Sequence, residues 1–202
     1  MIFQIRKRTE FEDIAYSIHL YFSGISLKNT AKAISKFIKR SHTDAIRDWI
    51  LKYLPERLYY KKTRIAEFII DETQIKVGAE YIWLWVAIES ETKNIVATSI
   101  SKERNMFVAE RLLSNVVKEY GKHPVSTDGG TWYPQACRFL NIEHHLHSHF
   151  EKSIIERTIQ YIKDRIECFD DYFPCRKQRC KLNHVKQWIN MFAYYYNREI
   201  IS

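Results

Sequence analysis

The chain has 202 residues, of which 46% are hydrophobic, and it contains only five glycines and four prolines. This composition excludes a disordered protein and leaves room for one mixed α/β domain with a small additional domain. The formal net charge of +8 lies entirely in the first third, because residues 1–65 hold 14 Lys and Arg against 6 Asp and Glu, whereas residues 66–202 hold 18 of each kind. A basic part joined to a neutral part is typical of proteins that bind a polyanion, most often a nucleic acid.

The N-terminus does not have the pattern of a secretory signal. Its apolar start, residues 1–5, is too short for one and runs directly into three basic residues. No apolar run approaches membrane-spanning length. The four cysteines are too few for a disulfide scaffold. We therefore predict a cytoplasmic protein with reduced thiols and no membrane partner.

Three short segments near the N-terminus show helical spacing of apolar residues. The first runs from Glu10 to Phe22, and Gly24 can end it. The second follows Ser26, a good N-cap, and the third begins near Thr43 and stops at Pro55. A brief turn before the last helix favours a helix-turn-helix domain over residues 1–58, with a plain three-helix bundle as the alternative.

In helix-turn-helix geometry, the start of the third helix would meet DNA. His42, Thr43 and Arg47 would then face outward, although Asp44 and Asp48 are unfavourable beside phosphates. Basic residues flank this surface, both in the preceding turn and in a basic linker predicted over residues 59–65; they are Lys39, Arg40, Lys61, Lys62 and Arg64.

An apolar run over residues 66–70 reads as a buried strand with Asp71 and Glu72 at its tip. Two more strands, over residues 80–89 and 95–100, predict an antiparallel meander. A helix over residues 106–120 then leads to a short strand that closes on Asp128. Such a crossover normally places the new strand parallel to its neighbour. If that neighbour is the first strand, Asp71 and Asp128 emerge at the same edge.

A helix over residues 151–167 carries a third acid. Its isoleucines form one apolar stripe, and Glu156 lies at the border of that stripe with Lys152 and Lys163 on the same flank. Such an arrangement suits a site that handles phosphate and metal, but it also describes an ordinary salt-bridged helix surface.

Together these stretches resemble the DDE transposases, in particular the small insertion-sequence group with an N-terminal helix-turn-helix. The resemblance rests on residues 41–50, 71–77, 81–88, 127–129 and 155–157, with a tyrosine-asparagine segment at 193–198. It implies a ribonuclease-H-like catalytic domain over residues 66–202, with a mixed five-stranded sheet flanked by helices. The catalytic acids would be Asp71, Asp128 and Glu156, with Lys163 as the basic residue that follows. Because only 28 positions separate Asp128 from Glu156, Glu151 remains a rival for the third acid.

The resemblance also implies an activity. The three acids would hold two Mg²⁺ ions, replaceable by Mn²⁺, with Asp71 bridging them, for cleavage and strand transfer on double-stranded DNA. Lys163 and Lys152 would contact DNA near the cut. The partners would be the element's terminal repeats, target DNA and a second copy of the chain or more. Two alternatives stay open: a transposase-derived DNA-binding protein without catalysis, and a ribonuclease-H-like nuclease or resolvase.

A zinc site is a weaker prediction. Four possible ligands, Cys168, Cys175, Cys180 and His184, occur with the spacing C-x6-C-x4-C-x3-H. This spacing does not match the common zinc ribbons or fingers, so we expect ordinary loop cysteines there.

Overall fold

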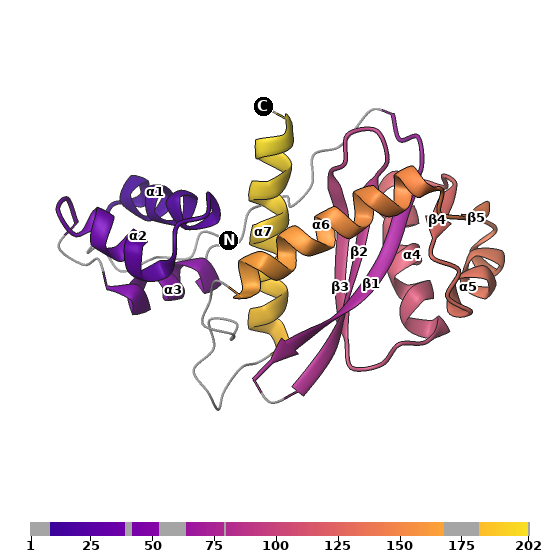
Figure 1. Cartoon of the computed structure of the whole chain (residues 1–202), viewed down its shortest axis with the longest axis horizontal. Helices are drawn as coiled ribbons and strands as arrows, with labels where there is room; N and C mark the ends of the chain where they lie inside the picture. Colours follow the sequence, from indigo (N-terminus) through magenta and orange to yellow (C-terminus); the bar gives the residue numbers. More distant parts are fainter. Residues whose placement is uncertain (1–8, 39–41, 53–63, 79, 168–181, 202) are drawn as a thin grey trace. The chain divides into compact units, whose positions relative to one another are not determined.

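The computed structural model describes residues 9–38, 42–52, 64–78, 80–167 and 182–201 (Figure 1). The chain folds as two compact units, Met1–Pro55 and Glu56–Ser202. Of the linker predicted over residues 59–65, only Arg64 and Ile65 are among the described residues.

The first unit contains the three predicted helices, α1 (Phe11–Phe22), α2 (Leu27–Ile34) and α3 (Thr43–Lys52). Ser26 caps α2, since its hydroxyl accepts a hydrogen bond from the Asn29 N–H at 3.2 Å. The core between the helices consists of buried isoleucines and aromatic residues, among them Ile14, Ile18, Ile34, Ile46 and Ile50. Phe37 is 85% exposed, because α2 ends three residues before it.

The second unit is built on the predicted mixed five-stranded sheet. Its strands are β1 (Phe68–Val77), β2 (Glu80–Glu89), β3 (Ile95–Ser101), β4 (Val125–Thr127) and β5 (His144–Leu146), in the order β3-β2-β1-β4-β5. The meander β1-β2-β3 is antiparallel, and β4 pairs in parallel with both β1 and β5. The parallel pairing of β4 with the first strand confirms the predicted crossover.

The first strand is longer than predicted. It does not end at Asp71 but continues to Val77, paired with β2 along its whole length. Polar residues enter this part of the strand because alternate positions, such as Ile75 and Val77, stay buried while their neighbours do not. Asp71 therefore lies within a strand that is rigid on both sides of it.

Helices cover both faces of the sheet. On one face, α4 (Met106–Tyr120) and α5 (Trp132–Leu140) form a core with the side chains of Phe68 and Ile70. Because successive side chains of a strand point to opposite faces, the other face of the sheet needs its own cover. On that face α6 (His149–Glu167) lies along β1, and α7 (Leu182–Ile201) lies against β3 (Figure 1). Phe107, near the start of α4, is 72% exposed. No helix in the described ranges combines the length and the apolarity that crossing a membrane would require.

The tyrosine-asparagine segment in α7 has a structural role at the edge strand. The buried Asn197 side chain accepts from the Ile95 N–H at 2.8 Å and donates to the Ile95 carbonyl at 2.9 Å, next to an irregularity in the β2–β3 pairing. Asn197→Ala leaves both backbone groups buried without a partner, so we expect the free energy of unfolding to fall by roughly 2–4 kcal/mol. Urea denaturation measures this loss.

The matched control is Asn190→Ala on the same helix. Asn190 is only partly buried and accepts one hydrogen bond, from the Thr98 hydroxyl at 3.1 Å. We expect Asn190→Ala to lower the free energy of unfolding by less than about 1 kcal/mol. Equal losses in the two variants would contradict the role assigned to Asn197.

Candidate active site

Two predicted acids meet where β4 ends beside β1. The parallel register pairs Ile70 with Thr127, so the next residue of each strand is an aspartate, Asp71 and Asp128. Carboxylate oxygens of Asp71, Glu72 and Asp128 lie within 4.8 Å of one another. One Asp71 oxygen also accepts a hydrogen bond from the Glu72 N–H at 2.8 Å. The topology thus brings together two of the three predicted catalytic residues, which are 57 positions apart in the chain.

The loop after Asp128 needs both of its glycines. Gly129 has a φ of +88°, and a Cβ there would lie 2.9 Å from the Leu146 side chain. At Gly130, a Cβ would lie 2.6 Å from the ring of Trp132. The Gly130 N–H donates to Asp128 at 2.9 Å. The chain can therefore turn sharply beside the acid while Trp132 packs over the turn.

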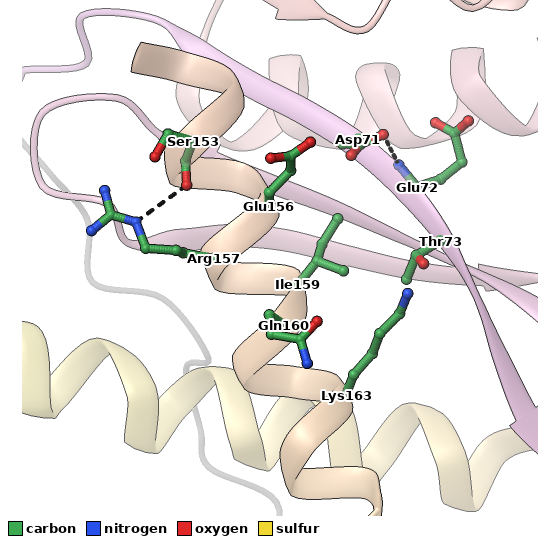
Figure 2. Close-up of a pocket in the computed structure, with 9 residues that line it drawn as sticks. All are labelled: Asp71, Glu72, Thr73, Ser153, Glu156, Arg157, Ile159, Gln160 and Lys163. Carbon is green, nitrogen blue, oxygen red and sulfur yellow. Dashed lines mark hydrogen bonds between the residues drawn. The ribbon is translucent and has the colours of Figure 1, made fainter. Parts of the chain in front are cut away.

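The third predicted acid faces the same place from α6. Figure 2 shows a pocket between β1 and α6 in which the Glu156 carboxylate points toward Asp71 and the Lys163 ammonium points toward Thr73. The pocket has a volume of about 510 Å³. Glu156 lies outside the tight group formed by Asp71, Glu72 and Asp128. Its nearest ionic partner is Lys152, at 3.9 Å on the exposed side of the helix.

The rival third acid, Glu151, has other partners. Its carboxylate accepts a hydrogen bond from the Ser148 N–H at 2.5 Å and lies 3.2 Å from His145 Nε2. His145 Nε2 is also 3.6 Å from Glu67, which precedes β1. Glu151 does not line the pocket that Asp71 and Glu156 share. The geometry therefore favours Glu156 over Glu151 as the acid that acts with Asp71.

Asp71 is held in a charge environment that would suit a cation. Burial, together with the negative charges of Glu72 and Asp128, raises the pKa of its carboxyl from an ordinary 3.8 to about 7, although the hydrogen bond from the Glu72 N–H and the charge of Arg104 oppose this rise. Carboxylate oxygens are the ligands that Mg²⁺ prefers, and a bound cation would relieve the crowding of these acids. Asp71 and Asp128, with Glu156 across the pocket, therefore fit a divalent metal.

Glu72 and its partners were not predicted from the sequence. The Glu72 side chain is fully buried, and its carboxylate accepts from Arg104 Nε at 2.6 Å and from Arg104 Nη2 at 2.5 Å. The Tyr133 hydroxyl donates to the other oxygen. Burial raises the pKa of Glu72, whereas the bonds from Tyr133 and Arg104 oppose that rise. The alternation of β1 could have indicated this group, because an acid at a core-facing position requires a buried partner.

The predicted DNA-binding residues are only partly described. His42 is exposed just before α3, where Thr43 and Arg47 are half-buried, and Arg47 forms an ion pair with Asp44 at 2.6 Å. Arg64 and Lys152 are exposed, and Lys163 lines the pocket. The other predicted residues lie outside the described ranges; they are Lys39, Arg40, Lys61 and Lys62. Of the weak zinc site, only His184 is described, half-buried in α7.

The carboxyl pair near the sheet edge gives a pH-dependent stability. Burial and a hydrogen bond shared with Glu151 raise the pKa of Glu67 from 4.5 to about 7. Between these values the folded chain holds a proton that the unfolded chain releases, so Glu67 stabilises the fold at low pH and loses this effect as the pH rises. The pKa of Glu151 is lowered, because its hydrogen bonds outweigh its burial, so Glu151 stays ionised in the folded state over this range.

We therefore expect the unfolding free energy of the native protein, relative to that of Glu67→Gln, to decrease as the pH rises from about 4.5 to about 7. Urea titrations of both proteins at half-unit pH steps measure this difference. A constant difference across the range would show that Glu67 does not titrate there.

Comparison with known proteins gives the family. Residues 66–198 match the family model for a DDE domain of IS240-type transposases (DDE_Tnp_IS240). The chain is 32% identical over 182 residues to the uncharacterized protein MJ0017 of Methanocaldococcus jannaschii, a match that spans 88% of this chain and 82% of the relative.

Solved structures show the same fold. The simian T-cell lymphotropic virus intasome in complex with PP2A regulatory subunit B56 gamma aligns with a TM-score of 0.50 and 15% identity, over 87% of this chain and 66% of that chain. The catalytic core domain of BIV integrase aligns with a TM-score of 0.47 and 14% identity, over 62% of this chain and 80% of that one. The HTLV-2 integrase catalytic core domain in complex with magnesium aligns with a TM-score of 0.46 and 17% identity, over 61% of this chain and 82% of that chain.

The second unit therefore has the predicted ribonuclease-H-like, integrase-like fold, with its mixed sheet between two layers of helices. The acids at positions 71, 128 and 156 all fall within the matched residues. Because the DDE-domain match covers most of the chain, the protein belongs to the family of IS240-type DDE transposases.

Proposed function

We propose that the protein is a DNA transposase that binds the ends of its element, cleaves the DNA there and joins the ends to target DNA. One observation carries this proposal: within a DDE domain, Asp71 and Glu156 line a common pocket, and the Asp128 carboxylate lies within 4.8 Å of that of Asp71. The carboxylates come from a strand, a strand end and a helix that are packed against one another. Rigid elements of this kind suit a reaction that requires exact alignment of attacking and leaving oxygens.

The three acids would hold the metal that the reaction needs. Bound Mg²⁺, or Mn²⁺ in its place, would neutralise charge on the phosphate and lower the pKa of the attacking hydroxyl. Asp71 and Asp128 supply oxygen ligands from the sheet, and Glu156 supplies one from α6. Asp71 is the residue that both other acids face, so its loss should affect the site most.

Lys163 is the residue best placed to contact the DNA backbone. Its side chain lines the pocket together with Glu156, two turns earlier on the same helix. Within the described part of the chain, no carboxylate forms an ion pair with Lys163. An ammonium group that stays available beside acidic groups is suited to a phosphate that enters between them.

The first unit would bind the element ends. The basic excess lies in residues 1–65, and the start of α3 presents His42 to solvent. Because two ends must be joined to one target, the proposal requires at least a homodimer on double-stranded DNA. Such a complex would form inside the cell, on the nucleoid.

A joining assay tests the proposal. A labelled linear fragment with the element's terminal sequence is incubated with the full chain, a supercoiled plasmid and Mg²⁺ or Mn²⁺. Transfer of label into the plasmid is the expected result. Cleavage without joining would indicate a nuclease or resolvase, and DNA binding alone would indicate a DNA-binding protein without catalysis; either outcome would refute the proposal.

A further inference from the structure

A hydrogen-bonded network with two buried members and one partly exposed arginine lies beside the two aspartates of the site. The network consists of Glu72, Arg104 and Tyr133. Arg104 is bound edge-on to one oxygen of Glu72 through two nitrogens, and Tyr133 donates to the other oxygen. The Glu72 carboxylate therefore has both oxygens occupied, although it lies within 4.8 Å of the oxygens of Asp71 and Asp128. Because both oxygens already have partners, Glu72 is a poor metal ligand, and its side chain is held in one position by Arg104 and Tyr133.

Arg104 is fixed on its flat faces as well as on its edge. Its guanidinium carbon lies 4.6 Å from the ring centre of Trp83 on β2 and 4.2 Å from that of Trp132 on α5. Planar stacking on aromatic rings, combined with a two-nitrogen contact to a carboxylate, is a geometry that arginine provides and lysine does not. The Nη2 atom that contacts Glu72 is also 4.0 Å from Asp128.

Each end of the network lies close in the sequence to one of the two aspartates. Glu72 directly follows Asp71 on β1. Trp132 and Tyr133 follow Asp128 by four and five residues, at the far end of the glycine turn. The Asp128 side chain is 41% exposed and is carried by that turn. Without the positive charge of Arg104, repulsion from Asp71 and Glu72 would favour movement of Asp128 toward solvent.

We propose that Arg104, through Glu72 and Tyr133, is a positioning residue that holds Asp71 and Asp128 at the separation required to bind one divalent cation. This inference rests on the metal-binding role that the proposed function gives to these two aspartates. Arg104 acts without touching the metal: it offsets the charge of Glu72 and fixes the end of the loop that carries Asp128. Mutation of residues that hold metal ligands in place typically lowers metal affinity by about 10- to 100-fold.

The test measures Mn²⁺ binding to the full chain without DNA, by electron paramagnetic resonance and calorimetry. Arg104→Lys keeps the charge but loses the planar contacts, so we expect Mn²⁺ affinity to fall by about 10- to 100-fold. Arg111→Lys is the matched control, because Arg111 is exposed on α4; it should bind Mn²⁺ like the native protein. Asp71→Asn should abolish binding at the site.

A second variant separates positioning from a purely structural role. Arg104→Met alone leaves Glu72 buried without its cation and should lower the melting temperature. Adding Glu72→Gln removes that unpaired charge, so the double variant should regain most of the melting temperature. We expect its Mn²⁺ affinity to stay at least about tenfold reduced. Recovery of both properties together would overturn the proposal, and so would native Mn²⁺ affinity in Arg104→Lys.

The outcome is independent of the joining assay. If the native protein binds Mn²⁺ through Asp71 but joins no DNA, the proposed transposase activity fails, while weaker Mn²⁺ binding in Arg104→Lys still supports the positioning role. If Asp71→Asn binds Mn²⁺ with native affinity, the two aspartates do not form the metal site, and the positioning proposal is overturned.

Discussion

Asp71→Asn is expected to bind element-end DNA with native affinity and to join it to target at a rate at least about a hundredfold lower. The amide keeps the size of the carboxyl group but removes the charge that a divalent cation needs. Asp71 lies within β1 rather than in the first unit, to which we assign binding of the element ends, so terminus binding should not change. Gel-shift titration and the joining assay, performed on the same preparation, measure the two properties separately.

The control for this variant is Asp164→Asn on α6. Asp164 is exposed, accepts a hydrogen bond from Gln160 at 2.5 Å and does not line the pocket. It removes one negative charge from the same unit and should leave joining unchanged. Native joining rates in Asp71→Asn would remove this residue from the active site.

The second large effect is a contrast between two glutamates of one helix. Glu156→Gln is expected to lower the joining rate by at least about a hundredfold without loss of stability, because Glu156 is exposed and points into the pocket. Glu151→Gln should do the opposite. It weakens the hydrogen bonds that the buried Glu151 carboxylate forms with Ser148 and His145, so it should lower the melting temperature while joining continues at temperatures where the variant is folded.

Joining rates and melting curves of both glutamine variants decide between the two acids. If Glu151→Gln abolishes joining and Glu156→Gln does not, the third acid is Glu151. The pocket between β1 and α6 would then have a role other than catalysis.

Much of the fold follows from local sequence patterns. The helix predicted over residues 106–120 has those bounds in the structure, since an apolar stripe fills it, Asn105 caps its start and Gly121 ends it with a φ of +90°. The approach of Asp71 to Asp128 could be predicted because a strand–helix–strand crossover fixes the direction of β4. The end of β1 could not be predicted in this way. Polar residues after Asp71 indicate the end of a strand when the sequence is considered locally, but the pairing of β1 with β2 continues through them.

The network behind the aspartates shows what local pattern leaves out. Arg104 precedes α4 and Tyr133 lies in α5, and nothing in their own surroundings in the sequence connects them with Glu72. Their meeting depends on how α4 and α5 pack on the sheet. For the same reason, local pattern does not indicate the grouping of Glu67, which precedes β1, with His145 and Glu151, which lie far later in the chain.

Anomalous diffraction from crystals of the full chain soaked in Mn²⁺ tests the central claim most directly. Our account predicts an anomalous peak in contact with carboxylate oxygens of Asp71 and Asp128, on the side of β1 that faces Glu156. A peak bound instead by Glu67, His145 and Glu151, with none at Asp71, would contradict it.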